Sequence, residues 1–172
     1  GDALAEQRRL VALLDGLQAL ARGDSDPGDL QDVDLADVAD VAVQAARARH
    51  GGVTWDVALP DEPVVVSGWE PGLRMVVENL LENAARHGRD GGTVGVRLEA
   101  GPPPALVVED DGPGIPEGER DRIFEPFARL DGTETPGSGL GLALVAQQVR
   151  LHDASIQVGE SPAGGAAFRV RF

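Results

Sequence analysis

The feature that most constrains the fold of this chain is a stretch of about 30 residues, 110–139, without the apolar periodicity of a helix or a strand. The stretch is rich in glycine, proline and charged residues. It lies between an apolar segment that ends at Glu109 and another that begins at Leu140. Irregular loops of this length are unusual inside compact domains, where they are typically lids or binding loops. The sequence therefore predicts that a ligand site forms around this loop.

Apolar spacing in the rest of the chain predicts helices and strands. Residues at spacings of three and four predict helices over 4–21, 35–49, 71–88 and 140–151. Short apolar segments predict strands over 53–59, 64–67, 93–99, 105–109, 155–158 and 166–172, and the last two form a hairpin. Helices that cover one face of a sheet give a two-layer α/β sandwich, which is the fold class that we expect. Residues 23–34 begin with an acidic turn-forming sequence and are expected to be a linker.

Composition excludes several classes of protein. All 15 cationic residues are arginine, and with 29 acidic residues the formal net charge is −14. That charge argues against nucleic acid or an anionic membrane as a partner. Without lysine the chain has neither a Walker A loop nor the phosphate-binding lysine of eukaryotic protein kinases. Without cysteine it has no disulfide, thiol nucleophile or cysteine-ligated metal.

The sequence also bears on where the protein acts. The longest apolar runs are far shorter than the roughly 20 residues that span a bilayer, and the chain does not open with a signal-peptide pattern. We therefore expect a soluble, intracellular domain. The leading Gly1 is consistent with a piece of a longer protein.

The predicted helix 71–88 carries the first candidate site. At 100° per residue Asn79, Asn83 and Arg86 fall within an arc of about 60°, at the border between the apolar stripe and solvent. The two asparagines are the only ones in the sequence. A carboxamide oxygen ligates a hard cation such as Mg²⁺ without adding negative charge beside a phosphate. Taken alone, the pair is equally well explained as the polar flank of a helix.

The second candidate site follows the predicted strand 105–109. Asp110 stands at its end, before Gly112 and Gly114, and glycine lets a backbone approach a ligand closely. A buried carboxylate there can accept a hydrogen bond from the exocyclic amine of adenine. Guanine has a carbonyl at that position, and the mismatch would cost about 1–3 kcal/mol. Taken alone, an Asp–Gly turn between strands is the commoner explanation.

The end of the long loop holds two further motifs. Glycines at 137, 139 and 141 lead directly into a helix, where free N–H groups and the helix dipole favour a phosphate. A flexible hinge is the competing explanation. Phe124 and Phe127 lie within the loop, where a short helix that pins the loop to the core would account for them. Arg129 follows them, within reach of a terminal phosphate.

In this order and spacing the segments resemble the N, G1, F and G2 boxes of the catalytic, ATP-binding domain of bacterial sensor histidine kinases, within the GHKL ATPase superfamily. The matching segments are Asn79–Ala84 (N-L-L-x-N-A), Asp110–Ile115 (D-x-G-x-G-I), Ile123–Phe127 (I-F-x-x-F) and Gly137–Leu142 (G-x-G-L-G-L). The resemblance covers about 35–172 and implies the Bergerat fold, with three helices on one face of a mixed sheet of about five strands. Residues 1–22 resemble the second helix of the family's dimerisation and histidine-phosphotransfer hairpin.

The resemblance implies ATP as the nucleotide and Mg²⁺ as the cofactor. It implies that Asn79, Asn83 and Arg86 are catalytic, that Asn83 is the metal ligand and that Asp110 binds adenine. The ATP-binding residues that it implies are Asn79, Asn83, Arg86, His87, Asp110, Gly112, Gly114, Ile115, Phe124, Phe127, Arg129, Gly137, Ser138, Gly139, Leu140 and Gly141.

The implied function is transfer of the γ-phosphoryl group of ATP to a histidine on the phosphotransfer hairpin, for relay to a response regulator. The implied partners are this hairpin, a second copy of the full-length kinase and a response regulator, with no nucleic acid. The implied location is a cytoplasmic domain of a kinase that is anchored in the bacterial membrane through segments outside this sequence.

The sequence departs from the family pattern at several points. Arg86-His87 stands where the family usually has Lys-Tyr, and His152-Asp153-Ala154 stands where many members have His-Gly-Gly. The acceptor motif H-[ED]-x-R-x-P is not found at any of the three histidines, His50, His87 and His152. We therefore expect the chain to begin just before the second hairpin helix.

Three other functions fit parts of the pattern. GHKL ATPases carry a glutamate at the position of Asn79 to activate water, and asparagine cannot act as that base. An anti-sigma-factor serine kinase is the second alternative, against which the phenylalanine box and the leading helix argue. The third is a nucleotide-binding pseudokinase with a structural role, against which the intact boxes argue.

Overall fold

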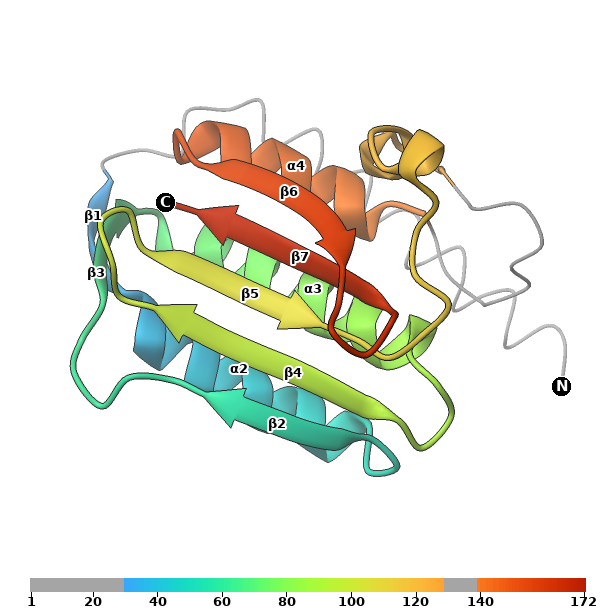
Figure 1. Ribbon diagram of the computed structural model, residues 1–172. Coiled ribbons are helices and arrows are strands. Elements are labelled where there is room, and N and C mark those ends of the chain that lie inside the picture. The colour runs from blue at the N-terminus through green and yellow to red at the C-terminus, as the bar shows by residue number, and fades with distance from the viewer. Residues whose placement is uncertain (1–29, 129–138) are drawn as a thin grey trace, which may run out of the picture.

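The computed structural model describes residues 30–128 and 139–172. Within them a five-stranded sheet with strand order β2-β4-β5-β7-β6 is covered on one face by helices α2, α3 and α4 (Figure 1). The helices are α2 (Leu35–Arg49), α3 (Glu70–His87) and α4 (Gly141–Leu151), with short 3₁₀ turns at Glu117–Glu119 and Arg122–Phe124. The strands are β1 (Gln31–Asp34), β2 (Thr54–Ala58), β3 (Val65–Gly68), β4 (Thr93–Glu99), β5 (Ala105–Glu109), β6 (Ser155–Glu160) and β7 (Ala166–Arg171).

The sheet is mixed, as expected. Strand β2 runs parallel to β4, whereas β4–β5, β5–β7 and β6–β7 are antiparallel pairs. A parallel neighbour requires a long crossover, and here the crossover contains β3 and α3. Strands β6 and β7 form the expected hairpin, with Ser155 opposite Arg171 and Glu160 opposite Ala166.

Apolar residues from the helices and one face of the sheet form the core. Helix α3 begins with Pro71 in its first turn, where a missing N–H costs nothing, and its apolar stripe is fully buried as the spacing predicts. The core residues of α3 are Leu73, Val76, Val77, Leu80, Leu81 and Ala84, and those of the central strands are Val94, Val96, Leu98, Leu106, Val108, Phe168 and Val170.

Ion pairs between charged side chains cover the central strands on the opposite face of the sheet. Arg97 on β4 forms a double hydrogen bond with Glu109 on β5, at 2.8 and 2.9 Å. Glu99 on β4 reaches across β5 to Arg169 on β7, at 2.6 and 3.0 Å. Because side chains alternate along a strand, Ala105 and Val107 share this face with the ion pairs, yet they are only 3% and 2% exposed. Strand β5 is therefore buried on both faces.

The beginning of the domain differs from the sequence-based expectation. Residues 31–34, expected to belong to a linker, form β1, which pairs with β3 in a separate two-stranded sheet. Asp34 at the end of β1 caps α2, because its Oδ1 atom accepts hydrogen bonds from the backbone N–H groups of Ala36 and Val64, each at 3.0 Å. Residues 31–34 therefore belong to the folded domain.

Some predictions fall on residues outside the described ranges. These are the helix within 1–22, the first part of the linker, and the candidate site residues Arg129, Gly137 and Ser138. Among the helices in the described ranges, none combines the length and the hydropathy that crossing a membrane would require.

Candidate functional site

Asp110 lies directly after β5, the central strand of the sheet, where the long loop begins. Its side chain is 3% exposed. Its Oδ1 atom accepts hydrogen bonds from the backbone N–H groups of Gly112, at 2.9 Å, and Ala166, at 3.1 Å. Its Oδ2 atom has no hydrogen-bond partner among the described residues. Burial raises the pKa of Asp110, and the two N–H groups offset only part of that rise.

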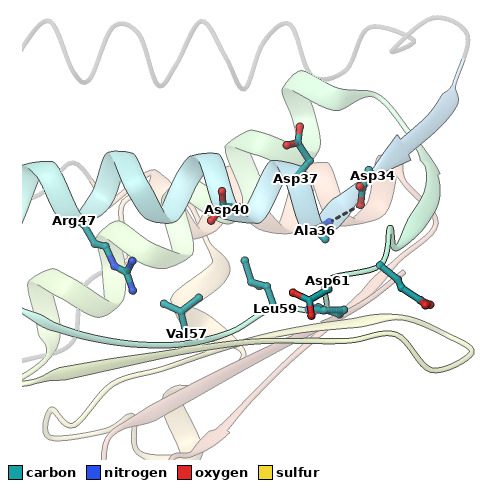
Figure 2. Close-up of a pocket in the computed structure, with 10 residues that line it drawn as sticks. Asp34, Ala36, Asp37, Asp40, Arg47, Val57, Leu59 and Asp61 are labelled. Carbon is teal, nitrogen blue, oxygen red and sulfur yellow. Dashed lines mark hydrogen bonds between the residues drawn. The ribbon is translucent and has the colours of Figure 1, made fainter.

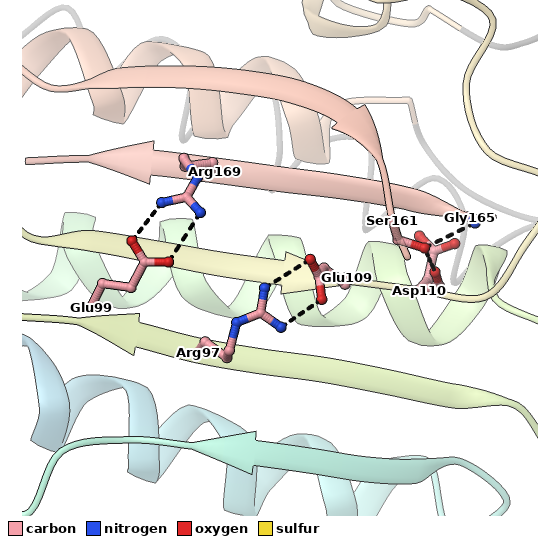
Figure 3. Close-up of polar contacts among 7 residues, drawn as sticks. All are labelled: Arg97, Glu99, Glu109, Asp110, Ser161, Gly165 and Arg169. Atoms are coloured by element: carbon pink, nitrogen blue, oxygen red, sulfur yellow. Dashed lines mark hydrogen bonds and ion pairs between the residues drawn. The ribbon is translucent and has the colours of Figure 1, made fainter. Parts of the chain in front are cut away.

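The turn between β6 and β7 holds the backbone of Asp110 (Figure 3). Ser161 donates a hydrogen bond from Oγ to the Asp110 carbonyl oxygen at 2.6 Å and accepts one from the Gly165 N–H at 2.9 Å. The Asp110 N–H donates to the Ala166 carbonyl oxygen at 2.9 Å. A Cβ atom at position 165 would overlap both the carbonyl oxygen and Oδ1 of Asp110. Asp110 is thus held by groups that lie more than 50 residues further along the chain.

Two glycines let the loop after Asp110 pack closely. A Cβ atom on Gly112 would overlap the carbonyl oxygen of His87, at the end of α3. Gly114 has a φ of +74°, a conformation that residues other than glycine rarely adopt, and a Cβ atom on it would lie 3.2 Å from the Gly164 carbonyl oxygen. Ile115 then packs partly buried against the core. The loop therefore joins the end of α3 to the β6–β7 turn around Asp110.

The neighbouring carboxylate, Asp111, serves a different loop. Its Oδ1 atom accepts a hydrogen bond from the Arg89 N–H at 3.0 Å, and its Oδ2 atom accepts one from the Thr93 N–H at 2.9 Å. These hydrogen bonds, first that from Arg89 and then that from Thr93, lower the pKa of Asp111. Asp111 therefore stabilises the loop between α3 and β4 through hydrogen bonds to the backbone N–H groups of Arg89 and Thr93.

Helix α3 and the start of α4 bring the asparagines and the glycine motif together. The Asn79 carboxamide donates from Nδ2 to the Met75 carbonyl oxygen at 2.8 Å. A Cβ atom on Gly141, the first residue of α4, would lie 2.8 Å from Asn79 Oδ1. Asn83 is half-buried one turn further along α3, and its side chain has no hydrogen-bond partner among the described residues. Asn79 therefore lies beside the N-terminus of α4, and Asn83 follows it on the same helix.

Arg86, the third polar residue predicted on this face of α3, forms an ion pair with a residue of its own helix. Its guanidinium donates to Glu82 at 2.7 Å, and Glu82 also lies 2.8 Å from Nε2 of His50, at the end of α2. Burial would raise the pKa of Glu82, but the hydrogen bond to His50 and the charge of Arg86 lower it overall. In this arrangement Glu82 joins α3 to His50 at the end of α2, and the contact of Arg86 with a phosphate stays a prediction.

The two phenylalanines of the loop have different environments. Phe124 packs edge-on against Phe168 of the core, with ring centroids 6.4 Å apart, so it anchors the loop. Phe127 is 53% exposed, has a φ of +65° and donates its N–H to the Gly139 carbonyl oxygen at 2.9 Å. Gly139 has a φ of +71°, and buried Leu140 follows it. The phenylalanine and glycine motifs are therefore in contact.

Two surface hollows lie on the helices that carry or neighbour these residues. One, of about 490 Å³, lies between α2 and the segment after β2, and half of the residues that line it are acidic, including Asp34, Asp37, Asp40 and Asp61 (Figure 2). The other, of about 380 Å³, lies between the ends of α2 and α3. Neither is lined by Asp110 or Asn83. Arg86 lines the second hollow, which therefore meets the candidate site at this one residue.

Comparison with known proteins shows which family the chain belongs to. Residues 68–172 match the family described as histidine kinase-, DNA gyrase B-, and HSP90-like ATPase. The chain belongs to this family, and the fold class expected from the sequence is confirmed.

The relatives narrow the resemblance to sensor histidine kinases. The chain is 39% identical over 175 residues to the sensor-type histidine kinase PrrB of Mycobacterium tuberculosis, which is 99% of this chain and 38% of PrrB. A solved structure of mycobacterial sensor histidine kinase MprB is 37% identical, with a TM-score of 0.75 over 83% of this chain and 96% of that one. The ATP binding domain of PrrB from Mycobacterium tuberculosis is 33% identical, with a TM-score of 0.69 over 84% and 96%. The chain thus spans less than two fifths of PrrB.

Sequence reasoning did not find Ser161, Gly165 and Ala166. The sequence pattern predicts these residues only as the turn and the first residue of a hairpin. Their contacts with Asp110 depend on β7 lying beside β5, a pairing between segments far apart in the sequence. The available signal was a small polar residue followed by two glycines in one turn, Ser161 to Gly165, which permits a close backbone approach.

Proposed function

We propose that this chain is the ATP-binding catalytic domain of a sensor histidine kinase. The single observation that carries the proposal is the buried Asp110 carboxylate. One of its oxygens is held by two backbone N–H groups, and the other has no partner among the described residues. Because backbone donors already satisfy Oδ1, a ligand N–H group is the natural partner for Oδ2. The exocyclic amine of adenine supplies such a donor, and the guanine carbonyl does not.

The phosphates of ATP would lie toward the asparagines and the start of α4. Helix α4 presents the positive end of its dipole beside Asn79. Asn83 fits a Mg²⁺ ligand, because its carboxamide is half-buried, has no hydrogen-bond partner among the described residues and offers a hard oxygen. When bound, Mg²⁺ would neutralise charge on the phosphates. Arg86 would contribute by exchanging its ion pair with Glu82 for a phosphate.

The reaction that we propose is phosphoryl transfer to a protein histidine. The imidazole nitrogen of the acceptor attacks the γ-phosphorus, the bond to the β–γ bridging oxygen breaks, and ADP leaves. Such a reaction depends mainly on positioning and on charge stabilisation. Asn79 supports transfer over hydrolysis, because an asparagine cannot take a proton from water as the glutamate of the related ATPases does.

The names of the relatives support the same proposal over an ATPase switch or an anti-sigma-factor kinase. The acceptor would lie on a phosphotransfer hairpin, with a second copy of the full-length kinase and a response regulator as further partners. We place the domain in the cytoplasm, with any membrane anchor outside this sequence.

Incubation with radiolabelled ATP tests the proposal. The chain is mixed with a separately supplied phosphotransfer hairpin that carries an acceptor histidine. We expect acid-labile label on the hairpin, none on the chain itself, and a rate that rises with hairpin concentration. Release of inorganic phosphate at an equal rate with and without the hairpin would show an ATPase instead. A control hairpin with the acceptor His changed to Ala should stay unlabelled.

A further inference from the structure

We propose that Ser161 is a positioning residue for base selectivity, which acts by holding Asp110 in the orientation that meets adenine. The inference rests on the proposed function, because it concerns the same site. It adds a residue from the β6–β7 turn, outside every motif that the sequence pattern singled out.

The Ser161 hydroxyl joins two backbone groups that are otherwise unconnected. Its Oγ atom donates to the Asp110 carbonyl oxygen at 2.6 Å and accepts the Gly165 N–H at 2.9 Å (Figure 3). The residue is 4% exposed. Water therefore has little access to replace either hydrogen bond. One hydroxyl thus connects the end of β5 to the turn before β7.

This connection continues to the carboxylate through Ala166, the residue after Gly165. The Ala166 N–H donates to Asp110 Oδ1 at 3.1 Å, and the Ala166 carbonyl oxygen accepts the Asp110 N–H at 2.9 Å. Ser161 therefore fixes the backbone on both sides of this pair of hydrogen bonds, of which the one from the Ala166 N–H orients the carboxylate. With Oδ1 fixed in this way, the direction of Oδ2 is fixed as well.

Removing the hydroxyl leaves two buried backbone groups without partners, one on each side of the connection. Their most direct relief is a shift of the turn away from Asp110, which would loosen the Ala166 N–H on Oδ1. Hydrogen bonds weaken steeply as their geometry departs from linearity. We therefore expect Ser161→Ala to weaken ATP binding about tenfold, within the range for an unsatisfied buried group.

A purely structural role for Ser161 makes a different prediction. If the hydroxyl only stabilised the turn, its loss would weaken every nucleotide alike. If it acts through Asp110, the loss should fall on nucleotides that carry the exocyclic amine. Purine riboside triphosphate, which has hydrogen in place of that amine, separates the two roles.

The experiment is calorimetric titration of the 172-residue chain with ATP and with purine riboside triphosphate, together with a thermal unfolding curve for each variant. For Ser161→Ala we expect about a tenfold loss of ATP affinity and no change for the analogue. Ser161→Thr, which keeps the hydroxyl, should restore the selectivity, and Ser155→Ala, on the exposed side of the same hairpin, should match the wild type. In an Asp110→Asn background Ser161→Ala should cause no further loss. If Ser161→Ala fails to fold, Ser161→Cys, with its weaker donor, should show intermediate selectivity.

Equal losses for both nucleotides, or an unchanged ratio in Ser161→Ala or Ser161→Cys, would overturn the inference. These outcomes differ from a failure of the proposed function. In that case the wild type would bind both nucleotides equally, or Asp110→Asn would bind ATP as the wild type does.

Discussion

The residues proposed to contact the base and those proposed to contact the phosphates form the two ends of the candidate site. The two ends differ in whether their side chains are already held in place for a ligand. At the base end Asp110 is held by Gly112, Ala166 and Ser161, and only Oδ2 is left for a ligand. At the phosphate end Asn79 is bonded to its own helix and Arg86 to Glu82. The base end is preorganised, whereas Arg86 at the phosphate end has to give up its partner before it can bind a phosphate.

This difference predicts how binding energy is distributed. A preorganised group contributes its full interaction, whereas a group that first gives up a partner contributes only the difference. Adenine recognition should therefore depend on a few rigid contacts that single substitutions abolish. Phosphate recognition should depend more on Mg²⁺ and should respond less to any single side chain.

The largest effect on binding is expected from Asp110→Asn. The Asn oxygen can still accept from Gly112 and Ala166, so its NH₂ group would replace Oδ2 and meet the adenine amine donor to donor. We expect ATP affinity to fall roughly tenfold to a hundredfold, measured by calorimetric titration. Asp56→Asn, on the exposed face of β2, is the matched control. Equal ATP binding by both variants would remove Asp110 from the base end.

Gly165→Ala should disturb the same end through sterics. The added Cβ atom would overlap the Asp110 carbonyl oxygen and Oδ1, so we expect a loss of about 1–3 kcal/mol in the free energy of unfolding, together with weaker ATP binding. Denaturant unfolding measures the first effect. Gly159→Ala is the control, because a Cβ atom there meets nothing within 4 Å. Equal stability of the two variants would contradict the close approach of the turn to Asp110.

Asn83→Asp tests the phosphate end. The added charge would lie beside the polyphosphate, so we expect about a tenfold weaker affinity for ATP with Mg²⁺ and unchanged affinity for adenosine, which lacks phosphates. Phosphoryl transfer to the hairpin should fall with the ATP affinity. An unchanged Mg²⁺ requirement at full activity would remove Asn83 from the site. Loss of adenosine binding would show that the two ends are not separable.

Asp111→Asn should have the smallest effect, and the effect should depend on pH. The folded-state pKa of Asp111 is lowered, so its contribution to stability is present above its unfolded pKa and is lost as the pH falls through the folded pKa. We expect Asp111→Asn to cost about 1 kcal/mol at neutral pH, because the carboxylate is partly exposed, and less in acid. The folded-state pKa of Asp110 is raised, so the stability linked to its protonated form is lost as the pH rises. We therefore expect that Asp110→Asn does not lower the free energy of unfolding at neutral pH. Denaturant unfolding at both pH values measures these differences.

Much of the fold could be predicted because local patterns in the sequence were strong. The helix over Leu35–Arg49 and the strands Thr93–Glu99 and Ala105–Glu109 have the predicted bounds, since clear apolar spacing and turn residues define them. Strand β1 could not be predicted. It has four residues with a single apolar side chain facing the core, Val33, and its partner β3 lies some 30 residues away.

The candidate site was predictable where glycines and acids are adjacent in sequence, as at Asp110–Gly114. It was not predictable where the partner comes from strands far apart in the sequence, as for Ser161. It was also not predictable where a charged side chain has several possible partners, as for Arg86, which pairs with Glu82. The residue after His152 illustrates a third limit. Asp153 has a φ of +51°, so a backbone conformation that glycine favours forms here at an aspartate.

The burial of β5 on both faces has a consequence for how the domain opens. Amide protons exchange with solvent when a segment unfolds locally, and a strand without an exposed face gains little from opening alone. Apolar residues cover β5 on one side, and the Arg97–Glu109 and Glu99–Arg169 pairs cover it on the other (Figure 3). We expect the amides of Leu106, Val107 and Val108 to exchange only through global unfolding. Asp110, which is proposed to recognise adenine, would then follow the strand that unfolds last.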